Sequence, residues 1–421
     1  MMSRQAKCFV LVAVMLTLPV AASAQISRVQ GMALQGDYIK DYSSIYSYPA
    51  QVPNVGNLIY AELGLASGFG LGGSATDRSM GAVLGNLWDG RLGTWAVHMR
   101  EFTPQLGQGD LIFAQPAPSY GPYGTDPNTH TNESFDLMWG QKFGTTSFGL
   151  RVNRSFYRSE SDIGGVATNL EFDVPSAIDP NLGRNILGVG AGVAFEMSPT
   201  TNLEGAVLFQ NRTFINDDPT LPVDTEEDNP ATYVVSARAM WQWQPNVMVV
   251  PVFKWYSYDL SIKDNLASTT EDNTLRGWQV GAAGNWTLGS NDLFVLGVTF
   301  AQNRVEQEGA LFSSPLPGGS TEITEMLTPQ LFGALETHVN NWLTLRVGAN
   351  KGVVHSEKHE NTTDTDKVSD SPFLMSLGAG LKVGTLQLDA LLNNTFPHTL
   401  GYVVSGVPNV VFTKVSATYA F

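Results

Sequence analysis

The sequence predicts an all-β fold: a transmembrane, antiparallel, up-and-down β-barrel of 14–16 strands with a short N-terminal plug or hatch segment. Three observations predict it. Apolar residues alternate with polar or small ones in many segments, the connections between segments are alternately short and long, and the chain ends on an alternating segment with a terminal aromatic residue. Outer-membrane barrels combine these features, whereas a soluble β-sandwich has no reason to sort its loops by length.

The first 24 residues read as a secretory signal peptide. Arg4 and Lys7 precede an apolar run over 9–22, and Ala22-Ser23-Ala24 forms a small-x-small cleavage pattern. The run is shorter than the ~20 residues that a membrane helix needs. Cys8, the one cysteine of the sequence, lies inside this segment. We therefore expect an exported mature chain that contains no disulfide and no thiolate metal ligand.

The charge of the chain excludes nucleic acid as an expected partner. Removing Arg4 and Lys7 leaves 22 basic residues against 39 acidic ones, a net charge of −17 for the mature chain. No apolar run of about 18 residues follows the signal, so no membrane helix is expected.

Residues 25–56 do not alternate and are rich in turn formers and tyrosine. They are too short for a domain and too aromatic for a linker. Because aromatic side chains that face a lumen need burial, we expect this segment to be a plug, with a periplasmic location as the alternative. Residues 57–421 are then the barrel.

About sixteen alternating segments follow. They start near residues 57, 78, 93, 134, 146, 185, 201, 232, 246, 275, 292, 321, 342, 371, 385 and 409. Tight turns are expected at 90–93, 144–146, 198–200, 245–246, 289–291, 340–341 and 384, and long polar loops at 105–133, 159–184, 213–231, 259–274, 305–320 and 356–371. Short turns face the periplasm and long loops the cell exterior in such barrels.

Aromatic residues gather near both ends of the predicted strands, as in the two girdles of a membrane barrel. The turn-side set is Trp88, Trp95, Trp243, Trp286 and Trp342, and the loop-side set is Phe156, Trp255, Tyr256, Trp278 and Phe300.

The polar face of each strand should line the lumen, because the apolar face must meet lipid. The substrate path is then lined by His98, Arg100, Asp136, Arg151, Glu204, Arg238, Glu336, Arg346, Lys382 and Asp389, with Asn153, Gln210, Gln279, Asn285, His338 and Lys414 on the same face. Both signs of charge are interspersed, which favours internal ion pairs, including pairs with a plug, over a selectivity ring. Inward glycines such as Gly188, Gly190, Gly192, Gly281, Gly378 and Gly380 leave room for a ligand, water or a folded-in segment.

No motif predicts an enzyme, a cofactor or a metal site. No Ser-His-Asp arrangement, HExxH run or phosphate-binding loop is present. His355 and His359 have helical metal spacing but fall in a predicted loop. The acidic stretch 216–229 lacks the spacing of a calcium loop, so a solvated loop is favoured over a divalent-cation site.

Two stretches resemble known families. Gly31-Met32, Gly36-Asp37, Asp41, Tyr46 and Pro49-Ala50 resemble the N-terminal stretch of outer-membrane fatty-acid and hydrophobic-compound transporters, with Tyr48 and Gln51 at two departing positions. The resemblance implies a fourteen-strand barrel, an N-terminal hatch that includes Asp37, Asp41, Tyr46, Tyr48 and Pro49, and passage of hydrophobic compounds. The chain end resembles the signal read by the barrel assembly machinery, with Lys414, Ser416, Tyr419 and Phe421 at its positions.

The expected function is passive passage of small, hydrophobic molecules across a Gram-negative outer membrane through a plugged lumen. The alternatives are an open, water-filled porin with cation preference and a non-transport barrel that serves as an anchor or assembly partner. The expected partners are outer-membrane lipid and lipopolysaccharide, the assembly machinery and a small-molecule substrate.

Overall fold

A computed structural model of the chain describes residues 26–65, 76–85, 87, 90–100, 133–160, 181–218, 223–227, 231–259, 261–264, 269–289, 291–308, 320–360, 364–371, 373–392 and 412–421. The predicted signal peptide, Trp88 and much of the predicted long loops lie outside these residues.

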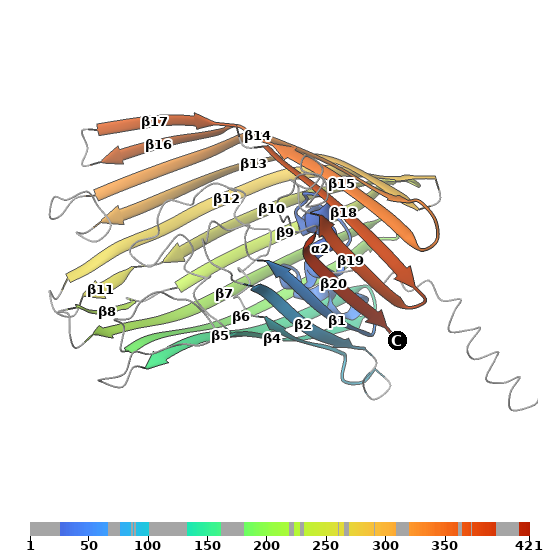
Figure 1. Cartoon of the computed structure of the whole chain (residues 1–421), viewed down its shortest axis with the longest axis horizontal. Coiled ribbons are helices and arrows are strands. Elements are labelled where there is room, and N and C mark those ends of the chain that lie inside the picture. Colours follow the sequence, from blue (N-terminus) through green and yellow to red (C-terminus); the bar gives the residue numbers. More distant parts are fainter. Residues whose placement is uncertain are drawn as a thin grey trace, which may run out of the picture.

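Sixteen antiparallel strands form a closed barrel in which each strand pairs with its neighbours and the last pairs with the first (Figure 1). Their bounds are β1 (Leu58–Leu65), β2 (Thr76–Leu84), β3 (Thr94–Arg100), β4 (Glu133–Phe143), β5 (Thr146–Glu160), β6 (Asn181–Ser198), β7 (Thr201–Asp218), β9 (Ala231–Gln244), β10 (Val247–Asp259), β12 (Thr269–Leu288), β13 (Asp292–Glu308), β14 (Ser320–His338), β15 (Leu343–Lys351), β18 (Phe373–Val383), β19 (Leu386–Leu392) and β20 (Phe412–Ala420).

This architecture confirms the predicted fold class. Fifteen of the sixteen strands begin within four residues of their predicted starts, and β12 begins six residues earlier than predicted, at Thr269. The count of fourteen that the family resemblance implied is wrong for this chain. Gly93, Gly144, Gly289 and Gly384 adopt positive φ at the short turns, a backbone conformation that glycine enters without a steric penalty.

Four further strands lie beyond the barrel at its long-loop end. They are β8 (Val223–Glu227), β11 (Ile262–Asp264), β16 (Val354–Glu360) and β17 (Asp364–Asp370). The strand β8 joins β7 to β11, and β16 pairs with both β14 and β17. The prediction of long loops over 213–231, 259–274 and 356–371 is therefore wrong in part, because these polar stretches continue the sheet above the membrane-spanning wall.

The two faces of the barrel are inverted relative to a soluble protein. Large apolar side chains such as Leu150, Val207 and Leu296 are about half exposed on the outside. Charged and polar side chains such as Arg151, Glu204 and Asp389 are buried inside. An apolar outer band around a polar interior is the arrangement that a lipid bilayer requires of a β-barrel, so the chain is a transmembrane barrel.

The aromatic residues described by the structure follow the predicted girdles with one exception. Trp243 and Trp342 are more than half exposed near the short turns, and Trp255, Trp278 and Phe300 are exposed on the outer face. Tyr256 was placed in the loop-side girdle, but its side chain points inward and is buried. It has the opposite parity from Trp255, and a strand alternates its side chains between faces.

The N-terminal residues lie inside the barrel at the end that carries the short turns and the C-terminus (Figure 1). They form a short helix α2 (Ile26–Gly31) and three 3₁₀ helices, η1 (Gly36–Tyr38), η2 (Tyr42–Tyr46) and η3 (Pro49–Asn54). We call residues 26–56 the N-terminal segment. Among the described residues, no helix has the length and apolar character to cross a membrane.

Candidate functional site: the lumen and the N-terminal segment

Inward glycines let the backbone of the N-terminal segment approach the wall. A Cβ on Gly348 of β15 would lie 1.6 Å from the carbonyl oxygen of Met32, and a Cβ on Gly149 of β5 would lie 2.1 Å from the carbonyl of Pro49. Gly281 of β12 leaves room for the Tyr38 hydroxyl in the same way. At these three positions any side chain would collide with the segment. The folded-in segment is therefore one occupant of the space that the inward glycines leave.

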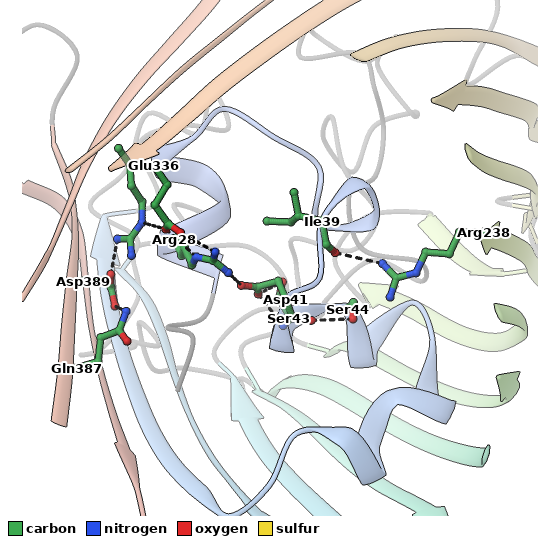
Figure 2. A network of polar contacts seen from close by, with 10 residues as sticks. Arg28, Ile39, Asp41, Ser43, Ser44, Arg238, Glu336, Gln387 and Asp389 are labelled. Atoms are coloured by element: carbon green, nitrogen blue, oxygen red, sulfur yellow. Dashed lines mark hydrogen bonds and ion pairs between the residues drawn. The ribbon is translucent and has the colours of Figure 1, made fainter. Parts of the chain in front are cut away.

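A chain of alternating charges joins the segment to the wall on one side (Figure 2). Arg28 of α2 donates two hydrogen bonds to Glu336 of β14, at 2.8 and 2.7 Å, and a third to Asp41 at 2.7 Å. Glu336 also accepts from Arg346 Nε at 2.5 Å, and Arg346 pairs with Asp389. Charge-assisted, bidentate pairs of this kind fix geometry as well as charge. The wall and the segment therefore share one network.

Asp41 has a second role within the segment. Its Oδ1 atom accepts hydrogen bonds from the backbone nitrogen of Ser43 at 2.9 Å and from the Ser43 hydroxyl at 2.7 Å, which caps η2.

Burial would lower the pKa of Arg28, but Glu336 and Asp41 raise it above its ordinary value. Arg28 therefore contributes a positive charge to the network.

The opposite side of the lumen holds the segment by its backbone. Lys254 of β10 pairs with Asp37, and Arg238 of β9 pairs with Glu204 of β7 at 2.8 Å. Arg238 also donates to the carbonyl oxygens of Asp37 and Ile39, at 3.0 and 3.4 Å. The guanidinium of Arg238 lies 4.3 Å from the centre of the Tyr48 ring, a cation–π contact.

A cluster of aromatic and basic side chains completes the contact near β1 to β5. His98 Nδ1 lies 2.6 Å from the Tyr60 hydroxyl and 3.0 Å from the Tyr46 hydroxyl. The guanidinium of Arg100 lies 3.7 Å from the centre of the Tyr46 ring. Arg151 bonds to Asp136 at 2.7 Å and donates to the Tyr46 carbonyl oxygen at 2.8 Å. Tyr46 is therefore held by its ring, its hydroxyl and its backbone.

The charges buried inside the described part of the barrel balance. The basic set is Arg28, Arg100, Arg151, Arg238, Lys254, Arg346 and Lys414, and the acidic set is Asp37, Asp41, Glu62, Asp136, Glu204, Glu336 and Asp389. With Arg28, whose side chain is 12% exposed, the described interior holds seven basic and seven acidic side chains, although the whole chain has more acidic than basic residues.

Most residues that the sequence assigned to the lumen lie on the inner wall. Nine of the ten predicted substrate-path residues are buried there. The tenth, Lys382, is exposed near the short-turn end of β18, and His338, assigned to the same face, is 40% exposed at the end of β14. Alternation gives the face of a strand but not the height along the barrel, which explains both errors.

The structure also describes the residues predicted for the plug and for the chain-end signal. Asp37, Asp41, Tyr46, Tyr48 and Pro49 are buried in the N-terminal segment, and in β20 the side chains of Lys414 and Ser416 point inward. Tyr419 and Phe421 stack outside at a centroid distance of 6.2 Å.

Three charged residues of the network were not predicted as site residues. Glu62 and Lys254 lie at inward positions of β1 and β10 and could have been found by the same alternation. Arg28 lies in the segment, where no periodic pattern marks it.

The metal hypotheses find no support in the described part of the chain. His355 and His359 lie on strand β16, so their spacing is not that of a helix, and His355 bonds to the Ser369 hydroxyl at 2.8 Å. Much of the acidic stretch 216–229 lies outside the described residues. Within them, no group of three or more His, Cys, Asp or Glu side chains is arranged to hold a metal ion.

An apolar patch covers the inner wall on the loop side of the segment. It consists of six buried side chains from five strands: Leu208, Val234, Tyr256, Tyr258, Leu275 and Val305. On β9, Val234 lies four residues nearer the loops than Arg238, and on β10 Tyr256 lies two residues beyond Lys254. We call this set the lumen patch.

No known family profile matches the chain, and no curated protein matches it. Among solved structures it is similar to the copper transporter OprC (TM-score 0.39, 12% identity, 80% of this chain and 61% of that chain). It is also similar to the deltaS2 mutant of the monoaromatic hydrocarbon channel TodX (TM-score 0.40, 10% identity, 96% of this chain and 100% of that chain). A Pseudomonas aeruginosa FadL homologue is similar as well (TM-score 0.40, 11% identity, 95% of this chain and 99% of that chain). The chain thus spans about three-fifths of the OprC chain. At this level the likeness concerns the barrel form, which the strand register already establishes.

The close contacts at the inward glycines predict the effect of adding a single methyl group at Gly348. In a Cys8→Ser, Met32→Cys background, Gly348→Ala should speed maleimide labelling of residue 32 by about tenfold, the equivalent of about 1.4 kcal/mol, because the Met32 carbonyl must move away. Gly188→Ala is the matched control, since its Cβ would meet nothing closer than 3.4 Å. Equal labelling rates in both variants would contradict the seating of Met32 against β15.

Proposed function

We propose that this chain is an outer-membrane channel for the passive passage of small, mainly hydrophobic molecules, and that the N-terminal segment closes its lumen on the periplasmic side. A molecule would enter from the loop side, contact the lumen patch and leave past the segment after a local movement of it. No chemical step is involved.

The lumen patch is the observation that carries this proposal. A cluster of apolar and aromatic side chains on the inner wall favours an apolar cargo over an ion, because it holds no charged or carbonyl group that could replace the water around an ion. These six side chains on neighbouring strands are buried, so we propose that a hydrophobic molecule inserts among them and gains about 25 cal/mol for each Å² of its own apolar surface that leaves water. In this proposal the patch lies on the entry path, because it is on the loop side of the segment.

The open porin remains the second candidate because sixteen strands is a size at which an aqueous channel appears. The buried charges argue against it. They pair with the segment and with one another, so the described interior offers no charged ring of one sign to select cations. A third candidate, a barrel that only anchors a partner, would not need the patch.

Polar substitution of the patch should lower uptake. Cells that express the Leu208→Asn, Val234→Thr variant should take up radiolabelled naphthalene about fivefold more slowly than cells with the parent chain, the effect of losing about 1 kcal/mol of apolar contact. Val235→Thr, which changes the neighbouring side chain of opposite parity on β9, should leave uptake unchanged. Identical uptake by the patch variant and the parent would rule out the patch as the path.

Removal of the segment should open the lumen to ions. In planar bilayers, a chain lacking residues 26–50 should show single-channel conductance well above that of the intact chain, because the contacts that fill the lumen are gone. The folded fraction of each sample is checked by heat-modifiable migration in SDS gels. High conductance of the intact chain would favour the open porin, and unchanged conductance of the folded deletion would show that the segment does not close the lumen.

A further inference from the structure

The wall around the closing seam, where β1 pairs with β20, is the shortest part of the described barrel. The β1–β20 ladder has seven residue pairs, and the ladders β19–β20, β1–β2 and β2–β3 have seven, eight and six. On the opposite wall, β6–β7 and β12–β13 have sixteen and seventeen. Because cross-strand pairs are the unit of sheet stabilisation, the described part of the seam is held by fewer wall contacts than the described parts of β6–β7 and β12–β13.

The N-terminal segment contacts the strands on one side of the seam through α2. This helix lies against β15, β18, β19 and β20. Its last residue, Gly31, approaches the backbone of β18 so closely that a Cβ there would lie 3.2 Å from the Cα of Gly378. Arg28 bonds to Glu336 of β14, and through Arg346 the same network reaches Asp389 of β19.

The segment contacts the strands on the other side of the seam as well. The backbone nitrogen of Ser27 donates to Glu62 of β1 at 3.0 Å, and the Ser27 hydroxyl bonds to the same carboxylate. The Tyr46 hydroxyl lies 3.1 Å from that of Tyr60 on β1. A buried cluster extends these contacts across four strands, comprising Tyr42, Ile45, Tyr46 and Val52 of the segment and Leu58, Tyr60, Val83, Ala96 and Met138 of the wall.

Two adjacent residues therefore bind strands on opposite sides of the closing point. Ser27 is bound to β1, and Arg28 is bound to the network of β14, β15 and β19. Covalent connection between residues 27 and 28 fixes the distance between these two groups of strands. Separating β1 from β20 would break either the Ser27–Glu62 contact or the Arg28 network. Either break would leave a buried carboxylate without one of its hydrogen-bond partners.

We propose that the N-terminal segment is an internal clamp that holds the β1–β20 seam closed. This role is separate from closing the lumen, because it depends on which strands the segment joins, β1 on one side of the seam and β14, β15 and β19 on the other. A segment that only closed the lumen could do so through contacts with any set of strands.

A disulfide rescue tests the clamp. The Ser27→Ala, Arg28→Gln variant, in a Cys8→Ser background, should lose its folded, heat-modifiable form about 5 °C below the parent, which is a shift of the size that a loss of one to two kcal/mol gives in a domain of a few hundred residues. A disulfide across the seam, from Ala61→Cys and Ala417→Cys at register partners, should remove that difference once oxidised. Reduction of the same sample should restore it.

Two controls make the outcome specific. A disulfide between register partners on the opposite wall, from Leu150→Cys and Ala191→Cys of β5 and β6, should not rescue the variant. Asn285→Ala removes a hydrogen bond to the Tyr38 carbonyl oxygen, far from the seam. Any fall in the unfolding temperature of this variant should not be reversed by the seam disulfide.

No shift in the Ser27→Ala, Arg28→Gln variant, or equal rescue by both disulfides, would overturn the clamp. Conductance measured on the same oxidised samples reports on lumen closure separately. A rescued barrel with high conductance would therefore retain the clamp and reject closure.

Discussion

Mutual neutralisation of charge between the N-terminal segment and the barrel wall is the interaction on which the rest of the structure depends. The wall contributes six basic and five acidic buried side chains, and the segment adds Arg28, Asp37 and Asp41. Each partner alone would leave buried charge without its counter-charge, which destabilises the fold. The inward glycines matter because they let the backbone come close enough for these pairs to form. Segment and wall therefore form one structural unit.

The sequence predicted the barrel well because its signals are local. Alternation, turn glycines and aromatic strand ends are each set by neighbouring residues, so fifteen of the sixteen strand starts and the inward face could be found. The ion-pair partners of the charged residues could not be predicted, because residues that pair are up to about three hundred positions apart in the sequence, as Arg28 and Glu336 are. Height along the strand was also hidden, which misplaced Lys382 and His338. The polar stretches 213–231, 259–274 and 356–371 resemble loops in sequence, because a strand that rises above the lipid has no apolar face to mark it.

The same arrangement links stability to function. The charged contacts lie at the short-turn end, and the lumen patch lies further toward the loops, so the lumen is polar and filled at one end and apolar at the other. In the proposed function, a hydrophobic molecule reaches the patch without disturbing the ion pairs, and its passage to the far side would require some of them to open. The contacts that hold the seam would then remain in place while those at β9 and β10 yield, because the two sets involve different residues of the segment.

Hydrogen exchange of the mature chain in detergent micelles tests the central claim most directly. The backbone amides of Ser27, Ser43, Ser44 and Tyr48, which are bonded to the wall or within the segment, should exchange as slowly as those of the barrel strands. The exposed turn at residues 340–341 supplies the fast reference. Protection of residues 26–56 comparable to that of β5 and β6 agrees with a segment built into the barrel by paired charges. Exchange at the rate of the exposed turn would contradict it.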